Sequence, residues 1–599
     1  MPTFATSGLS VNYRIPGVYV EVELGSQLGS ILPNKRLLIP GYALSTSTKP
    51  INVPWLPGTS REVREAHGPN SPITRAYEAA KSQLKAGIGA EIWIAPLPEP
   101  SGGTAATHFV EFMAAPSGGV LGAATAAAIP DTCRITFAGR GATFGIDAGD
   151  TLATVATKAK TALDAVPDLP VTISRVGAKL TATDLVKGEI GNDMPIIVEF
   201  DSKGASGIAA SPGVFEYTGT ATLAGSATLG LNAHSASVTI GGTNTPIQSA
   251  QATVAKIRSD GFCVDAAIPG TPTDGKVTLF YRNGRAAHRL DIALVTVTGQ
   301  TVAAAVGTLG VGTPDLTNLL TKLRSLPAFR VWAPFWEDTS NWSSTCSHIE
   351  TEAASPKQKR QVVIACTSKR GELLRATNLP AATSPKLTSS PRYNLMWQQG
   401  AVQQGFELAA RYAAAAVSQD YQAPNLNAEK LKTADGVPLG IPDMGDRPTD
   451  DEINLMIDTY HFGAIGVDGD GENAIIGSFT TYAAQSTRDV KYQKFSGIYA
   501  VDFMCDDMRY FLWKRFGQRN LKPNGKPRSA RTVSPDQVKS AVFERILYYD
   551  VELDIYDGAK EMRDAVMAAV LQIPTRINVA APLRPVADLD QTDILATAE

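Results

Sequence analysis

Apolar and polar residues alternate near both ends of the chain, and this alternation predicts a β-strand at each end. Segment 18–24 reads Val-Tyr-Val-Glu-Val-Glu-Leu, the period of two that is typical of a half-buried strand. Segment 577–579 reads Ile-Asn-Val and leads into residues 580–599, which two prolines interrupt and which show no helical period. We expect both strands to lack a partner close by in their own chain.

A lone strand has to find a partner, because buried backbone N–H and C=O groups are costly when they stay unpaired. Extended arms at chain termini commonly lend strands to neighbouring copies of the same protein. We therefore expect an N-terminal arm over 1–35 and a C-terminal arm over 577–599. The residues expected to pair between subunits are Val18, Tyr19, Val20, Glu21, Val22, Ile577, Asn578 and Val579.

Two separated stretches, 36–102 and 313–450, have the pattern of one α/β domain. In the first stretch, a helix with Ser71 as its N-cap and Pro72 at its first position lies between two short apolar segments. The apolar segments at 37–39 and 91–95, and later those at 329–335 and 360–367, predict strands, while 313–323 and 403–416 predict helices. Together they predict a discontinuous core domain around a parallel sheet.

The pattern changes after Pro100, where the chain becomes rich in Gly, Ala and Thr and its strands become short. Two halves of this stretch resemble each other: an Ala-Thr-Val at 153–155 recurs at 252–254, and a Lys-Leu-Thr at 179–181 is matched by Lys-Val-Thr at 276–278. The separation is 97–99 residues. We predict two inserted β-rich modules, 103–210 and 211–312. Their expected matching elements are 134–138 with 237–240, 150–165 with 250–259, 180–183 with 277–281 and 195–200 with 290–297.

A further α+β domain is expected over 451–576. Asp468-Gly-Asp-Gly-Glu472 is a hairpin turn signal between two short strands. An amphipathic helix is expected at 498–516. Ser534, Pro535 and Gln537 form a capping box for the next helix. The predicted fold class is thus α/β plus β: an α/β core with inserted β-rich modules, an α+β C-terminal domain and extended terminal arms.

Composition and charge exclude several function classes. The chain has 599 residues, a net charge of −3 and five scattered cysteines. This charge gives no general attraction to nucleic acid or to an anionic membrane. No apolar run is long enough to span a bilayer, and the N-terminus does not read as a signal peptide. The odd cysteine count suits a reducing compartment.

Chemistry-bearing motifs are few, and none is complete. After Asp468 and Asp470, a calcium loop would need Gly and Glu where Asn473 and Phe479 stand. A P-loop-like stretch ending at Lys276 has Val277 in place of the Mg²⁺-binding Ser or Thr. The six histidines are isolated. We therefore expect no catalytic residue, no cofactor and no metal.

Residues 509–531 carry basic side chains and no acidic one. Three interpretations remain open: a solvated segment after a helix, a contact with an acidic protein partner, and a nucleic-acid contact, which the overall charge disfavours. The candidate contact residues are Arg509, Lys514, Arg515, Arg519 and Lys522.

Several segments, in this order, resemble the contractile-tail sheath proteins of myophages, particularly the Mu-like branch. The segments are 14–21, which reads Arg-Ile-Pro-Gly-Val-Tyr-Val-Glu, the turn at 68–72, and the stretches 149–193, 509–526 and 532–545. His67 stands where Phe is usual in the family's turn. The resemblance covers most of the chain.

The resemblance implies a structural function. Sheath subunits stack as rings around a rigid tail tube, are held extended by a baseplate, and contract to drive the tube through the host envelope for genome ejection. The implied partners are further copies of the chain, the tube protein, and baseplate and tail terminator proteins, with no direct nucleic acid and no membrane insertion. The implied location is the virion tail, assembled in the host cytoplasm.

The family's α/β domain is subtilisin-like, but protease activity is not implied here, because the chain has no GxSxG-like motif and no recognisable catalytic set. The contraction energy would be stored in the assembly rather than taken from a nucleotide. Two alternatives stay open: an α/β hydrolase with β-rich substrate-binding modules, and a β-rich tail fibre or adhesin.

Overall fold

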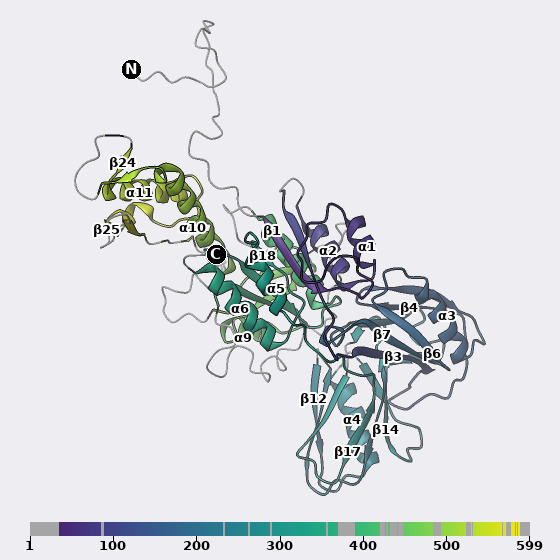
Figure 1. Cartoon of the computed structure of the whole chain (residues 1–599). Helices are drawn as coiled ribbons and strands as arrows, with labels where there is room; N and C mark the ends of the chain where they lie inside the picture. Colours follow the sequence, from purple (N-terminus) through teal and green to yellow (C-terminus); the bar gives the residue numbers. More distant parts are fainter. Residues whose placement is uncertain are drawn as a thin grey trace, which may run out of the picture. The chain divides into compact units, whose positions relative to one another are not determined.

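A computed structural model of the chain describes most of the residues between 35 and 586 (Figure 1). The described residues are 35–85, 89–231, 234–260, 264–287, 290–354, 358–368, 390–419, 426, 429–431, 440, 442, 447–482, 493–522, 529, 531–565, 567–570, 577–581, 583 and 585–586. The expected strand at 18–24 lies outside them. The chain forms two compact units, one built mainly from Tyr499–Ala587 and the other mainly from Asn34–Asp420 and Pro424–Ile498.

The larger unit contains a seven-stranded sheet in the order β2-β1-β18-β19-β20-β21-β22. Every neighbouring pair is parallel except β21 and β22. The strands are β1 (Arg36–Tyr42), β2 (Glu91–Leu97), β18 (Val331–Trp332), β19 (Val362–Thr367), β20 (Tyr393–Trp397), β21 (Gly463–Val467) and β22 (Asn473–Gly477). The parallel core predicted from the sequence is therefore present.

Helices cover both faces of this sheet, as the burial of its strands on both sides requires. One face carries α2 (Pro72–Gln83) and α8 (Gly405–Ser418), with α1 (Ser60–His67) packed against α2. On the other face, α5 (Thr317–Leu323), α6 (Thr339–Ala353) and α9 (Asp450–Asp458) share one hydrophobic cluster with the strands. Ser71 is the N-cap position of α2 with Pro72 at its first residue, as predicted, although the Ser71 side chain makes no capping hydrogen bond.

Several boundaries differ from the sequence-based expectation. The hairpin β21–β22 extends the core sheet, so the core does not end at 450 and the C-terminal domain does not begin at 451. The helix expected from 313 begins at Thr317, and the strand expected at 329–335 is reduced to the two residues of β18. Helix α6 was missed, because its sequence is polar and lacks a clear apolar face.

The inserted region repeats one topology twice. The first half contains β3 (Ala105–Ala114), β4 (Asp131–Phe137), β5 (Arg140–Ile146), α3 (Leu152–Asp164), β6 (Val171–Val176), β7 (Lys179–Lys187), the short 3₁₀ helix η1 (Glu189–Gly191), β8 (Ile196–Phe200) and β9 (Ile208–Ser211). The second contains β10 (Gly213–Thr218), β11 (Gly225–Leu231), β12 (His234–Ile240), α4 (Pro246–Ser259), β13 (Val264–Ala267), β14 (Gly275–Tyr281), β15 (Ala286–Ala287), β16 (Leu290–Val295) and β17 (Thr301–Ala305).

The strand orders of the two halves correspond element by element. Sheet β6-β7-β3-β9 matches β13-β14-β10-β17, and β5-β4-β8 matches β12-β11-β16. The internal duplication is therefore visible in the topology, with one correction: β4, the segment expected at 134–138, corresponds to β11 and not to β12 at 237–240. The two strands of a hairpin share the same alternation, so the pattern could not distinguish them.

One continuous buried cluster runs through both halves. Phe112 and Ile135 from the first half and Phe215 and Leu279 from the second belong to it. In addition, β15 of the second half pairs with β8 of the first. The two halves thus share a single hydrophobic core.

The smaller unit is built on two helices and two small sheets. The helices are α10 (Phe495–Phe516), whose first residues lie in the larger unit, and α11 (Pro535–Val551). The strands are β23 (Asn520–Leu521) with β24 (Thr532–Val533), and β25 (Met567–Val570) with β26 (Ile577–Ala580), while η3 (Ala559–Ala565) is a 3₁₀ segment. The capping box predicted at Ser534 and Gln537 is present at the start of α11.

Candidate functional site

Apolar packing holds α10 against α11. Phe503 and Met504 of α10 and Val542, Ile546 and Tyr549 of α11 are at most 5% exposed and belong to one cluster. Val538, Val542, Ile546 and Tyr549 follow the helical period along α11. This cluster fixes the outer face of α10 as well, because a helix that buries one side must present the other.

A buried ion pair crosses the same interface. The Arg545 guanidinium donates to both carboxylate oxygens of Asp507, with Nε–Oδ2 at 2.6 Å and Nη2–Oδ1 at 2.9 Å. The Tyr549 hydroxyl donates to Asp507 Oδ2 at 2.7 Å. Burial, and then the charge of Asp507, raise the pKa of Tyr549 well above its usual range. This bidentate pair sets the rotation of α10 relative to α11.

The last turns of α10 expose a mixture of basic and aromatic side chains. Arg509 and Lys514 are exposed, Tyr510 is 37% exposed, and Trp513 is 71% exposed. Tryptophan is seldom exposed on a protein surface. Where it is exposed, it is often part of a protein interface. The basic residues were predicted from the sequence, but Trp513 was not. Trp513 lies three residues after Tyr510 and four after Arg509, a spacing that places the three side chains on one face of a helix and could have indicated it.

The predicted basic residues do not all have the same surroundings. Arg515 donates to Glu544 of α11 at 2.7 Å, so part of its charge is used within the unit. The Arg519 guanidinium lies 5.3 Å from the centre of the Phe516 ring. Arg509, Lys514 and Arg519 are exposed, while Lys522 is half-buried and its backbone N–H bonds to Val533. Residues 523–528 lie outside the described part of the chain.

The expected C-terminal strand is β26, and it is not alone. It pairs antiparallel with β25 of the same chain, from Met567↔Ala580 to Val570↔Ile577. The strand β25 was not predicted from the sequence, so the expectation that residues 577–579 lack a partner in their own chain is wrong. Among the described residues no third strand joins the pair. Two strands alone form a marginal sheet, so β25–β26 can accept further strands at its edges.

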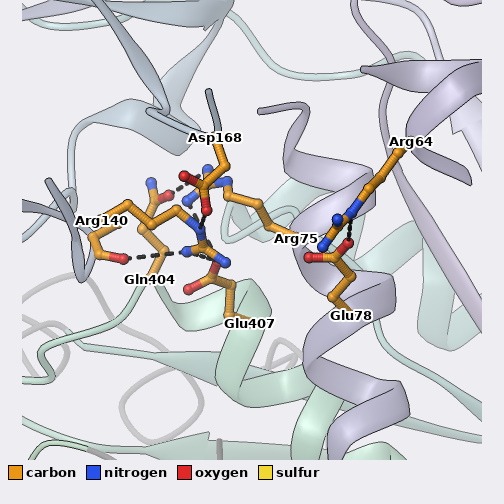
Figure 2. A network of polar contacts seen from close by, with 8 residues as sticks. Arg64, Arg75, Glu78, Arg140, Asp168, Gln404 and Glu407 are labelled. Carbon is orange, nitrogen blue, oxygen red and sulfur yellow. Dashed lines mark hydrogen bonds and ion pairs between the residues drawn. The ribbon is translucent and has the colours of Figure 1, made fainter. Parts of the chain in front are cut away.

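A buried ionic junction in the larger unit connects the inserted region to the core helices (Figure 2). Arg75 of α2 lies 3.4 Å from Glu407 of α8, and Arg140 of β5 donates to the same Glu407 oxygen at 2.9 Å. Arg140 also lies 3.3 Å from Asp168. The side chains of Arg75 and Glu407 are each 2% exposed. Three separate segments therefore converge on one buried carboxylate.

Gln404, at the N-cap of α8, extends the junction. Its Oε1 accepts from Arg75 Nη2 at 2.7 Å, and its Nε2 donates to the Ile190 carbonyl at 3.1 Å. Burial lowers the pKa of Arg75 to about 10, a value at which it stays charged near neutral pH. The sequence analysis missed this junction. Its only signal was the presence of Glu407 and Arg411 inside the otherwise apolar helix α8.

The hairpin turn at 468–472 holds an ammonium group of the chain itself. Lys430 Nζ lies 3.4 Å from Asp468, 2.8 Å from Asp470 and 2.6 Å from Glu472. All three carboxylates thus contact one lysine of the chain itself, which agrees with the hairpin interpretation. Across the described segments, no group of three or more His, Cys, Asp or Glu side chains is arranged to hold a metal ion. Within the same segments no helix is long and apolar enough to cross a membrane.

Comparisons by fold retrieve sheath proteins. The sheath tail protein of Desulfitobacterium hafniense is 12% identical, covers 95% of this chain and 96% of its own, and gives a TM-score of 0.42. That of Listeria innocua is 10% identical, covers 93% and 92%, and gives 0.42. The sheath of an extracellular contractile injection system in its contracted state is 14% identical, covers 48% and 77%, and gives 0.34.

No protein-family model and no curated protein matches the chain. These three structures are sheath proteins, the kind of protein that the sequence motifs resemble. Flagellar cap proteins of Helicobacter pylori and Escherichia coli are also retrieved, with TM-scores of 0.13 and 0.11. The sheath structures do not distinguish the Mu-like branch from other branches.

Proposed function

We propose that this chain is a structural subunit of a contractile tail sheath that polymerises around a tail tube. The order of the sheath-like segments along the sequence supports the proposal. The observation that carries it is the small β25–β26 sheet, whose two strands are joined by no third one in the described part of the chain. Such a sheet suits a joint between subunits, because strand addition supplies backbone hydrogen bonds that do not depend on particular side chains.

In the proposed assembly, the strand at 18–24 of one neighbour adds to this sheet. Residues 577–579 pair with β25 in their own chain and would meet a neighbour through the other edge of β26. One edge of β26 already pairs with β25, so a neighbour's strand would add to an edge that this pairing leaves open. Backbone pairing would keep subunits connected while they change their packing during contraction. The partners proposed are further copies of the chain, the tube protein, and baseplate and terminator proteins. The location proposed is the virion tail, with assembly in the host cytoplasm.

We also propose that the domain limits follow the sequence-based division up to 450, whereas the C-terminal domain begins near Tyr499, because α9 and the hairpin at 463–477 belong to the larger unit. We propose further that the core domain is subtilisin-like in fold and that the chain has no enzymatic activity. The Mu-like assignment remains a prediction from the sequence.

Negative-stain microscopy of the purified full chain tests the proposal. Rings, tubes or polysheaths are expected, and a variant lacking residues 1–24 should be a soluble, folded monomer that forms none of them. Discrete monomers with a hydrolytic turnover would favour the enzyme alternative, and thin rods would favour the fibre. If the variant without residues 1–24 forms normal tubes, strand exchange through the N-terminal arm is wrong.

A further inference from the structure

A cavity of about 220 Å³ lies at the carboxyl ends of strands β1 and β18 in the larger unit. From β1 the chain continues through α2 to β2 on one side, and from β18 it continues through α6 to β19 on the other. The cavity therefore lies where the strand order reverses. In open α/β sheets, ligands bind in the crevice at this position.

Four aromatic side chains form the inner part of the cavity. Tyr42 at the end of β1, Phe335 and Trp336 after β18, and Phe406 on α8 line it, and each is at most 4% exposed. The close approach of Phe335 requires Gly41, because a Cβ atom there would lie 2.4 Å from the ring. Glu189 and Thr313, which also line the cavity, are exposed, so the cavity reaches the surface on their side.

The walls are acidic. Glu189, Asp193, Glu337 and Asp338 line the cavity, and no lysine, arginine or histidine does. Burial raises the pKa of Tyr42 above its usual range, and the charges of Asp338 and Glu189 raise it further. Both carboxylates therefore act on the Tyr42 hydroxyl. Carboxylates beside aromatic faces attract cations through charge and through the ring quadrupole.

The N-terminus of α8 also lies at the cavity and would by itself favour an anion. Glu337 already occupies that position: its Oε1 lies 3.0 Å from where a Cβ atom of Gly405 would stand. Glu337 also accepts from the Thr367 hydroxyl at 3.2 Å. Glu337 thus complements the positive end of α8, and Asp338 caps α6, where it accepts from the Asn341 backbone N–H at 2.9 Å. Glu189 and Asp193 add two further carboxylates to the lining, which contains no basic side chain.

The size of the cavity and one hydrogen-bond donor without a partner indicate the kind of cation that the cavity binds. The cavity is smaller than the roughly 300–1,000 Å³ typical of small-molecule pockets. The carboxylates that line the cavity are not arranged to hold a metal ion, since the described residues contain no group of three or more ligands that could do so. The indole Nε1 of Trp336, which is buried, has no hydrogen-bond partner among the described residues and offers itself to an acceptor. A peptide carries both a basic side chain and carbonyl acceptors.

We propose that this cavity is a binding site for a lysine or arginine side chain presented by another polypeptide. The carboxylates hold the charged head, the aromatic rings contact the aliphatic stem, and Trp336 donates to a carbonyl of the incoming chain. This proposal does not rest on the proposed sheath function. Its test uses the unassembled protein, so either proposal can fail without the other.

The test is titration of the full-length, unassembled protein with N-acetyl-lysine methylamide, followed by saturation-transfer NMR and calorimetry at low salt. N-acetyl-norleucine methylamide is the matched neutral probe. The lysine probe should bind, with affinity falling as salt is added, and the norleucine probe should bind at least tenfold more weakly. Equal binding of the two probes, or none by the lysine probe, overturns the proposal without any substitution.

Variants assign the binding to this cavity. Asp193→Asn should weaken the lysine probe roughly tenfold, as expected for loss of a hydrogen bond to a charged group, and Glu189→Gln should weaken it less, because Glu189 is exposed. Glu216→Gln on β10 lies outside the cavity lining and is the control. If the control changes affinity as much as Asp193→Asn does, or if neither cavity variant changes it, the site is not this cavity. n-Butylamine, which carries the same single charge as the lysine probe but no carbonyl acceptor, should bind more weakly than the lysine probe, and equal or tighter binding would overturn the role given to Trp336.

Discussion

At the scale of single residues, we expect the largest losses of stability on substitution at a few buried charged side chains. Glu407 has two arginine partners and a side chain that is 2% exposed. Removing one member of a buried ion pair leaves a charge without compensation, which costs far more than the net worth of the pair. The exposed pair Arg61–Glu65 on α1, with side chains 87% and 63% exposed, provides a contrast within the same unit.

We expect Glu407→Gln to destabilise the larger unit by about 3 kcal/mol, since Arg75 is then left buried beside Arg140. Glu65→Gln should change stability by less than about 1 kcal/mol. The shift of the first denaturant transition of the unassembled protein measures both. Equal shifts for the two variants would show that the junction does not hold the inserted region to the core.

Asp184 on β7 gives a pH dependence. Its burial raises the pKa to about 6, and the nearby Arg75 only partly opposes this. The pKa of Asp184 in the folded state lies above its unfolded value of about 3.9. Protonated Asp184 therefore contributes to the free energy of unfolding, and this contribution is complete below about pH 4. That contribution, about 3 kcal/mol, is lost as the pH rises through 6.

Asp184→Asn should therefore become more stable relative to the unsubstituted protein between pH 4 and pH 7. Denaturant unfolding at several pH values measures the difference. The exposed Asp201→Asn, which removes a carboxylate from the surface of the same region, serves as the control. A constant difference for Asp184→Asn would contradict the raised pKa.

At the scale of elements, helix α10 has two functions on two faces. One face packs on α11 through Phe503 and Met504, and the last turns of the other expose Arg509, Trp513 and Lys514. Because Arg515 pairs with Glu544, a reversal of Arg515 would place two carboxylates together within one unit. Lys514 and Arg519 are therefore the better probes of an external contact.

Reversing Lys514 and Arg519 to Glu should weaken assembly on tail tubes or on neighbouring subunits, most strongly at low salt, because screening reduces the lost attraction. Reversal of the exposed Lys203 and Lys276 in the inserted region changes net charge equally and is the control. Co-sedimentation with tubes across ionic strengths measures the effect. Assembly that stays unchanged would return the segment to a solvated role.

At the scale of the whole molecule, the inserted region begins and ends at one place. Thr104 and Val311 form an antiparallel bridge, with N–O distances of 3.0 and 3.1 Å in the two directions. Neighbouring strands lie about 5 Å apart, and the backbone at Gly103 also lies beside Val311, so a short linker can join residue 102 to Val311. Glu407 would then keep Arg75 and lose only Arg140.

Deletion of 103–310 with a two-residue Gly-Ser linker should therefore leave a folded core that still forms tubes. The isolated region should fold alone, because its two halves share one buried cluster. Microscopy of the deletion variant and circular dichroism of the isolated region measure these outcomes. Complete loss of soluble assembly on deletion would show that the inserted region contributes to the lattice.

The sequence alone determined the elements whose cause is local. The capping box at Ser534, the start of α2 at Pro72, the turn at 468–472 and the recurrence of 153–155 at 252–254 all reflect contacts within a few residues or a copied segment. Hydrophobic period and turn chemistry are written into the chain at that range, so they could be read without the structure.

Only the tertiary structure decided what depends on segments far apart in the sequence. The junction at Glu407 joins residues separated by 332 and 267 positions. The cavity joins the end of β1, the loop after β18 and the start of α8, and the partner of β26 is β25. Neither a buried charge nor a strand edge has a periodic signature, because its partner is chosen by packing and not by neighbours in the chain.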